Sequence, residues 1–160
     1  MRIHQVETKQ KLPINKDEAW KFFSTPYNLK VLTPENMDFE ITNGVTENDN
    51  MYSGQIICYK IKLLPMLKLK WVTEITHIKE GEFFIDEQRF GPYAFWHHLH
   101  HISELDGGVL MHDKLHYKMP FGILGSLVHA LFVKKEIKRI FEYRNRKLIQ
   151  LFGEFEEKNN

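Results

Sequence analysis

The sequence predicts an α+β fold in which a long C-terminal helix lies against a curved antiparallel sheet. Several segments between residues 38 and 118 alternate apolar and polar residues with the two-residue period of a strand. Turn sequences rich in glycine, asparagine and aspartate separate these segments, which is typical of an antiparallel meander. After Pro120 the apolar residues recur with the 3.6-residue period of a helix. A helix with so much apolar surface needs a broad sheet to cover it, and such a closure leaves room for an internal cavity.

The N-terminal part supplies a first strand and two short helices. Residues 2–12 form the strand, which Pro13 ends. Asn15 is a favourable N-cap for a helix that stops at Ser24-Thr25-Pro26, and a second short helix is expected over residues 27–32. The later strands are expected at residues 38–45, 51–61, 67–78, 82–90, 94–104 and 108–118. The apolar stripe of the C-terminal helix consists of Leu124, Leu127, Val128, Leu131, Phe132, Ile137, Ile140, Phe141, Arg144, Leu148 and Phe152.

The composition indicates one globular domain over residues 1–160. The 22 Lys and Arg residues nearly balance the 21 Asp and Glu residues, which argues against a nucleic-acid partner and against a polybasic membrane anchor. No stretch has the length of a membrane span or the pattern of a secretory signal, so we expect a cytoplasmic protein without stable membrane insertion. The single cysteine, Cys58, fits a reducing compartment and is expected to be a buried small apolar residue. Nothing in the sequence specifies an oligomeric state.

The strand at residues 94–104 is expected to direct two histidines into the interior. Alternation places His98 and His100 on the same face as Trp96 and Ile102, and apolar neighbours mark that face as the inner one. The histidines of this and the next strand that are expected on the outer face are His97, His101, His112 and His116.

The neighbouring strands add further polar groups to this inner face. Asp113 and Tyr117 share a face of residues 108–118 with apolar side chains, and Asp86 and Gln88 are expected to point the same way from residues 82–90. Together with apolar and aromatic residues of the cavity wall, these polar groups make up the expected ligand contacts. The full set is Asp86, Gln88, Trp96, His98, His100, Met111, Asp113, Tyr117 and Phe132.

This polar cluster has four possible interpretations. Each buried polar group without a partner would cost roughly 1 to 3 kcal/mol, so the groups must bond one another, water or a ligand. The cluster is therefore a structural network, a device that orients a ligand, an acid and base pair, or a metal site. His98, His100 and Asp113 match the ligand set of a non-haem iron site, but the same spacing arises in any strand that lines a polar pocket. We assign no metal and, without a glycine-rich phosphate loop, no cofactor.

Residues 62–68 place apolar side chains between lysines in a hairpin loop. This loop either packs over the end of the sheet or forms a lip that admits an apolar ligand or touches a membrane or partner.

Several short motifs resemble those of the START-like (SRPBCC, Bet v 1-like) superfamily, and most of all its small bacterial ligand-binding or polyketide cyclase-like branch. They are Phe23-Ser-Thr-Pro-Tyr-Asn-Leu29, Leu32-Thr-Pro34, Phe84-Ile-Asp-Glu-Gln88, Gly91-Pro92, Trp96-x-His98-x-His100, Asp113-x-x-x-Tyr117 and Pro120-Phe-Gly122. The resemblance implies a helix-grip fold: a seven-stranded curved antiparallel sheet, two short helices after the first strand, and a long C-terminal helix over a hydrophobic cavity.

The resemblance also implies a function. The expected role is binding of an apolar small molecule such as a lipid, polyketide or aromatic compound. The alternative is an enzyme of the cyclase, aromatase or dehydratase kind, in which His98 or His100 acts as base and Asp113 or Tyr117 as its partner. An interaction module that uses the outer face of the sheet is a third class, and the sequence leaves open whether the protein is an enzyme.

Overall fold

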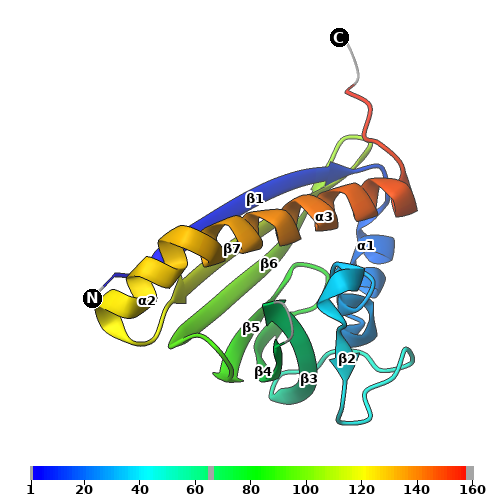
Figure 1. The fold of residues 1–160 in the computed structure, drawn as a ribbon. Helices are drawn as coiled ribbons and strands as arrows, with labels where there is room; N and C mark the ends of the chain where they lie inside the picture. The colour runs from blue at the N-terminus through cyan, green and yellow to red at the C-terminus, as the bar shows by residue number, and fades with distance from the viewer. Residues whose placement is uncertain (1, 65–66, 158–160) are drawn as a thin grey trace.

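The structure, a computed structural model, describes residues 2–64 and 67–157 and is built on one curved antiparallel sheet (Figure 1). Its strands are β1 (His4–Leu12), β2 (Glu40–Ile41), β3 (Gln55–Leu64), β4 (Leu67–Lys79), β5 (Phe83–Phe90), β6 (Phe95–Leu105) and β7 (Gly108–Lys118). Their order across the sheet is β1-β7-β6-β5-β4-β3-β2. The predicted meander is therefore confirmed from β2 to β7, and β1 returns to pair with β7.

The helices lie in two places in the chain, between β1 and β2 and after β7. They are α1 (Lys16–Phe23), the 3₁₀ helices η1 (Pro26–Leu29) and η2 (Glu35–Met37), α2 (Gly122–Val128), the π-helical turn η3 (His129–Val133) and α3 (Lys134–Phe152). Figure 1 shows α3 running along the sheet beside β1 and β7, with α1 near its C-terminal end. This arrangement is the helix-grip fold that the sequence predicted.

Local chemistry explains where the first helices begin and end. The Asn15 side chain accepts a hydrogen bond from the Glu18 backbone N–H at 2.8 Å, so the predicted N-cap of α1 is confirmed. The second short helix is a single 3₁₀ turn that begins at Pro26, slightly earlier and shorter than expected. Proline fits this first position because its fixed φ suits a helix and its missing N–H would have no partner there.

The strand expected at residues 38–45 is much shorter than predicted. Asp38 has a φ of 46°, which interrupts an extended chain before β2. Beyond β2, the Asn43 side chain replaces backbone pairing: its amide donates to Ile56 O at 2.7 Å and its oxygen accepts from Cys58 N at 3.1 Å. Short-range alternation could not reveal that a side chain ends this ladder.

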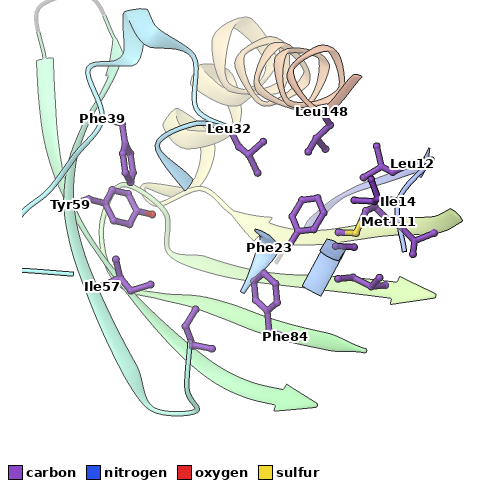
Figure 2. Packing of buried hydrophobic residues seen from close by; sticks show 14 of the residues in the cluster. Leu12, Ile14, Phe23, Leu32, Phe39, Ile57, Tyr59, Phe84, Met111 and Leu148 are labelled. Atoms are coloured by element: carbon purple, nitrogen blue, oxygen red, sulfur yellow. The ribbon is translucent and has the colours of Figure 1, made fainter. Parts of the chain in front are cut away.

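The core fills the space between the sheet and the helices. Figure 2 shows Phe23 of α1, Ile57 of β3, Phe84 of β5 and Leu148 of α3 among the buried side chains of this space. Each is less than a tenth exposed. Burial of an apolar side chain of this size contributes about 1.5 to 3 kcal/mol to folding.

The prediction of one continuous apolar stripe along the C-terminal helix was wrong for its first part. Ile137 and Leu148 of α3 are buried, whereas the members of the predicted stripe that precede Ile137 are exposed. An α-helical period carried back from Ile137 would place Ile123 near the buried face, but the π-helical turn holds an extra residue and turns Gly125 and His129 inward instead. The exposed members of the predicted stripe are Leu124, Leu127, Val128, Leu131 and Phe132. Phe132 is therefore no part of the core, contrary to expectation.

Two further expectations concern the edge of the sheet. Cys58 is half-buried rather than buried, because its inward neighbours Ile57 and Tyr59 leave it on the outer face of β3. The hairpin loop expected at residues 62–68 is shorter than predicted, because β3 continues to Leu64 and β4 begins at Leu67. Residues 65–66 lie outside the described part of the chain, so neither role expected for the loop is tested.

Candidate functional site

A cavity of about 160 Å³ lies between the concave face of the sheet and α3. Most of its wall is apolar. The sheet contributes Ile57, Tyr59, Ile61, Trp71, Ile75, Phe84 and Trp96, and α3 contributes Ile137, Ile140 and Phe141. Asp86, His98 and His100 form a polar patch in this wall, and Arg144 lies beside it. The other polar residues of the wall carry no charge and are Thr25, Asn28, Thr33 and Thr73.

The sheet register brings the predicted polar residues together on three adjacent strands. Asp86 of β5 pairs with His98 of β6, and His100 of β6 pairs with Asp113 of β7. His98, His100 and Asp113 are each less than a tenth exposed. The inward orientation predicted for all four side chains is what the structure shows.

Two carboxylates enclose the two imidazoles. His100 Nε2 lies 2.8 Å from Asp86 Oδ2, and His100 Nδ1 lies 2.8 Å from Asp113 Oδ1. His98 lies at 3.5 Å from Asp86 Oδ2 through Nδ1 and at 3.2 Å from Asp113 Oδ1 through Nε2. The two rings are close, with centroids 3.8 Å apart, and the Phe84 ring stacks on His100 at 4.2 Å. The contact of His100 Nε2 with Asp86 has hydrogen-bond geometry, whereas the contacts of both rings with Asp113 Oδ1 are close ion contacts without that geometry.

Each carboxylate also has a partner outside the histidine pair. The Trp96 indole N–H donates to Asp86 Oδ1 at 3.2 Å. Arg144 Nη1 of α3 lies 3.2 Å from Asp113 Oδ1, and its guanidinium lies over the Phe23 ring at 5.5 Å. Arg144 thus links the long helix to the cluster.

The contacts shift the carboxyl pKa values downward. Burial alone would raise the pKa of Asp113, but the Arg144 guanidinium and the two imidazoles outweigh it and hold that pKa well below its usual range. Burial opposes ionisation of Asp86 as well, yet the hydrogen bond from His100 and the nearby His98 lower its pKa. Both carboxylates are therefore ionised at neutral pH.

The two imidazoles shift in opposite directions. Burial and the neighbouring His100 lower the pKa of His98. Burial also opposes a charge on His100, but its contacts with Asp113 and Asp86 overcome this and raise its pKa. With His100 protonated, the His100 and Arg144 cations balance the Asp86 and Asp113 anions, and the cluster is neutral as a whole.

Asp86, His98 and His100 could together hold a divalent cation. One donor atom of each lies within 4.8 Å of the others. The sequence suggested Asp113 as the carboxylate ligand, but Asp113 contacts the opposite ring nitrogen of His100 from the one that faces Asp86. A cation would have to displace the hydrogen bond between His100 Nε2 and Asp86 Oδ2, and it would lie beside the Arg144 guanidinium that already pairs with Asp113. We therefore assign no metal here.

Five of the predicted ligand contacts do not line the cavity. Asp113 lies behind the two histidines, which separate it from the cavity lining. The Gln88 amide bonds the Tyr93 backbone through both of its ends, at 2.7 and 3.2 Å, and so secures the β5–β6 turn. The Tyr117 hydroxyl bonds His129 Nε2 at 2.8 Å in a separate cluster. Met111 is enclosed in the core, and Phe132 is exposed at the surface.

The histidines predicted on the outer face lie there. They are His97, His101, His112 and His116, and all four are half-buried. His112 Nε2 lies 2.8 Å from Glu7 Oε1 of β1. The division of the histidine-rich segment between two faces of the sheet is therefore confirmed.

Sequence reasoning missed two partners. The sequence places Arg144 in the apolar stripe of the C-terminal helix. A charged residue among apolar ones is a signal for a buried ion pair, and this signal was available in the sequence. His129, which stacks on His4 at 3.6 Å and bonds Tyr117, interrupted the most apolar stretch of the sequence. Its partner on β1 could not be found without the register of that strand.

The comparisons with known proteins agree on the fold. No protein-family model matches the sequence, and no curated protein does. A protein of Chromobacterium violaceum has a similar structure with a TM-score of 0.70 at 11% identity, covering 94% of this chain and 98% of its own. Ginseng major latex-like protein 151 from Panax ginseng gives a TM-score of 0.67 at 11% identity, covering 94% and 97%. Norcoclaurine synthase from Thalictrum flavum, a point mutant in complex with a transition-state analogue, gives 0.63 at 10% identity, covering 94% and 96%. The chain thus has the helix-grip fold of the Bet v 1-like proteins, as its sequence motifs suggested.

Proposed function

We propose that the protein binds an apolar small molecule with one uncharged polar end in the internal cavity. The observation that carries this proposal is the asymmetry of the cavity wall, which is mostly apolar and in which Asp86, His98, His100 and Arg144 form a single cluster of ionisable groups. Apolar walls supply affinity at about 25 cal/mol per Å² buried, and a single polar patch supplies orientation.

The size of the cavity limits the part of the ligand that it can hold. Its volume of about 160 Å³ is close to that of cavities of about 150 Å³ that bind benzene. A single ring with a short polar substituent therefore matches the space in this conformation.

The charge balance of the cluster selects the polar end. When His100 is protonated, two cations offset two anions, and a charged ligand group would then be buried without a counterion, at a cost of several kcal/mol. A hydroxyl or carbonyl group can instead exchange hydrogen bonds with the imidazoles or carboxylates. We therefore expect phenol to bind more tightly than toluene, and benzoate to bind least.

Calorimetric titration with these three compounds tests the proposal. Ile57→Phe fills the cavity and is expected to abolish phenol binding, whereas Ile56→Phe on the outer face of the same strand should leave it unchanged. Circular dichroism shows whether each variant is folded, and native mass spectrometry of gently purified protein looks for a co-purified ligand. Equal phenol binding by the two variants would remove the cavity from the function.

The opposite pKa shifts of His98 and His100 favour a second candidate, acid and base catalysis. A neutral imidazole can accept a proton while the adjacent imidazolium donates one. Norcoclaurine synthase, a structural neighbour, is an enzyme on the same fold. In this reading, His98 takes the α-proton of a bound ketone and His100 gives a proton to its carbonyl oxygen.

Exchange of the α-protons of acetophenone with D₂O, followed by NMR, tests this chemistry. The protein should accelerate exchange, His98→Gln should remove the acceleration, and His97→Gln on the outer face should retain it. Exchange at the rate of protein-free buffer would leave binding as the function.

A further inference from the structure

The surface around α2 and η3 exposes an unusual concentration of apolar side chains. Ile123 is 90% exposed, Phe121 84% and Leu124 71%. The other exposed apolar residues of this surface, which we call the apolar tip, are Leu127, Val128, Leu131 and Phe132. Soluble proteins rarely leave so many neighbouring large apolar side chains in water, and such patches mark contacts with membranes or other proteins.

The backbone holds the apolar tip in this outward position. Gly125 lies against Pro120 so closely that a Cβ atom there would come within 1.8 Å of the Pro120 carbonyl oxygen. His129 docks on the other side through its hydrogen bond to Tyr117 and its stack on His4. These contacts direct Gly125 toward the turn after β7 and His129 toward β7 and β1, so the opposite face of α2 and η3 stays exposed. Figure 1 shows α2 at the end of the molecule where β1 begins and β7 ends.

Phe121, at the start of the apolar tip, has an unusual backbone conformation. Its φ is 64°, in the left-handed region that residues other than glycine seldom adopt. The ring gains no burial from this conformation, because it is among the most exposed side chains of the chain. A large apolar residue is therefore displayed at the start of the helix, next to Ile123.

The charges that border the apolar tip in sequence are basic as far as Glu136, which is paired with Arg139. Between residues 114 and 135 the sequence holds four lysines and no acidic residue, although the whole chain carries a net charge of only +1. Lys118 precedes the apolar tip in sequence, and Lys134 and Lys135, both exposed, follow it directly. Apolar side chains bordered by lysines match a bilayer surface with anionic headgroups.

We propose that the apolar tip is a peripheral docking site for an anionic lipid bilayer. Its apolar side chains enter the boundary between headgroups and acyl chains, and Lys134 and Lys135 contact the lipid phosphates. A second copy of the chain is disfavoured as the occupant, since a symmetric contact would bring the same lysines together. Docking needs no spanning segment, and no helix in the described residues is long and apolar enough to cross a membrane.

Vesicle flotation tests the proposal with the purified chain. We expect binding to vesicles of phosphatidylcholine mixed with phosphatidylglycerol and weak binding to phosphatidylcholine alone. The double variant Ile123→Asp with Leu127→Asp should lose binding to both. Lys134→Gln with Lys135→Gln should weaken binding to the anionic vesicles about thirtyfold, since each lysine near the surface contributes roughly 1 kcal/mol.

Two matched controls make the outcome specific. Phe90→Asp removes a similarly exposed aromatic residue from β5, and Lys30→Gln with Arg146→Gln removes two exposed charges elsewhere. Both should bind as the unaltered chain does. The proposal is overturned if the chain ignores anionic vesicles, if the Asp variant still binds, or if sedimentation shows a dimer that this variant dissociates. Phenol binding by the Asp variant is expected to be intact, so failure here is distinct from failure of the cavity function.

Discussion

At the scale of single residues, the buried charges of the cluster depend on one another. Asp113 contacts Arg144, His98 and His100 through the same oxygen, and Asp86 closes the other side of the imidazole pair. Removal of one partner from such a buried group leaves an opposite charge without compensation. Substitutions here are therefore expected to act on folding as well as on ligand binding.

Asp113→Asn is expected to lower the free energy of unfolding by about 3 kcal/mol at pH 7, because Arg144 and His100 lose their counterion. Since the folded pKa of Asp113 is depressed, the stabilisation exists above the unfolded pKa of about 3.9 and is lost as the pH falls through the lower folded value. Urea unfolding across acidic pH measures both effects. Glu7→Gln on the outer face is the control, and equal losses in the two variants would contradict the buried ion pair.

The two cluster histidines should titrate in a fixed order. The raised pKa of His100 stabilises the fold below about pH 6.5, and this contribution is lost as the pH rises through the folded value. His98 has a lowered pKa, so it destabilises the fold as the pH falls below about 6.5. NMR titration of the imidazole nitrogens, with His98→Gln for assignment, should show His100 charging first as the pH falls. The reverse order would show that Asp113 and Asp86 do not hold the charge on His100.

At the scale of secondary structure elements, local sequence explains the strands better than the connections. Period-two alternation correctly placed Asp86, His98, His100 and Asp113 on the inner face, because the pleat of a strand leaves only two choices. It could not show that Gln88 turns to the Tyr93 backbone, since that contact depends on the geometry of the β5–β6 turn.

The turn between β5 and β6 offers a test of this role for Gln88. A Cβ at Gly91 would lie 2.4 Å from Gln88 Oε1, so Gly91→Ala should displace the amide and break both bonds to Tyr93. At about 1 kcal/mol for each hydrogen bond, we expect a loss of about 2 kcal/mol in thermal or urea unfolding.

The same change in a Gln88→Ala background should cost much less, because the clash is gone. Additive losses in the double variant would mean that Gly91 is required for its backbone conformation alone.

At the scale of the whole molecule, the sequence was sufficient to predict the architecture but not the size of the cavity or the ion pair beside it. The alternation, the turns and the Asn15 cap all favour the same meander and helix, and the structure has both. The volume of the cavity and the ion pair between Arg144 and Asp113 depend on the position in which α3 packs over the sheet. No local pattern carries that information.

The π-helical turn between α2 and α3 has a consequence for changes in chain length. A π-helical turn contains about one residue more than an α-helical turn. Removal of one residue from η3 can therefore restore a regular helix without rotating Gly125 away from Pro120 or His129 away from Tyr117. We therefore expect deletion of Ala130 to leave the melting temperature within a few degrees of the parent. Glu142 is also exposed but lies within the regular part of α3. Its deletion should rotate Leu148 out of the core and lower the free energy of unfolding by about 3 kcal/mol. Thermal unfolding by circular dichroism compares the melting temperatures of the two deletion variants. Equal losses would show that η3 does not accommodate the removal of a residue. A loss in the Glu142 deletion alone would show that the helix tolerates a deletion within the π-helical turn and not within its regular part.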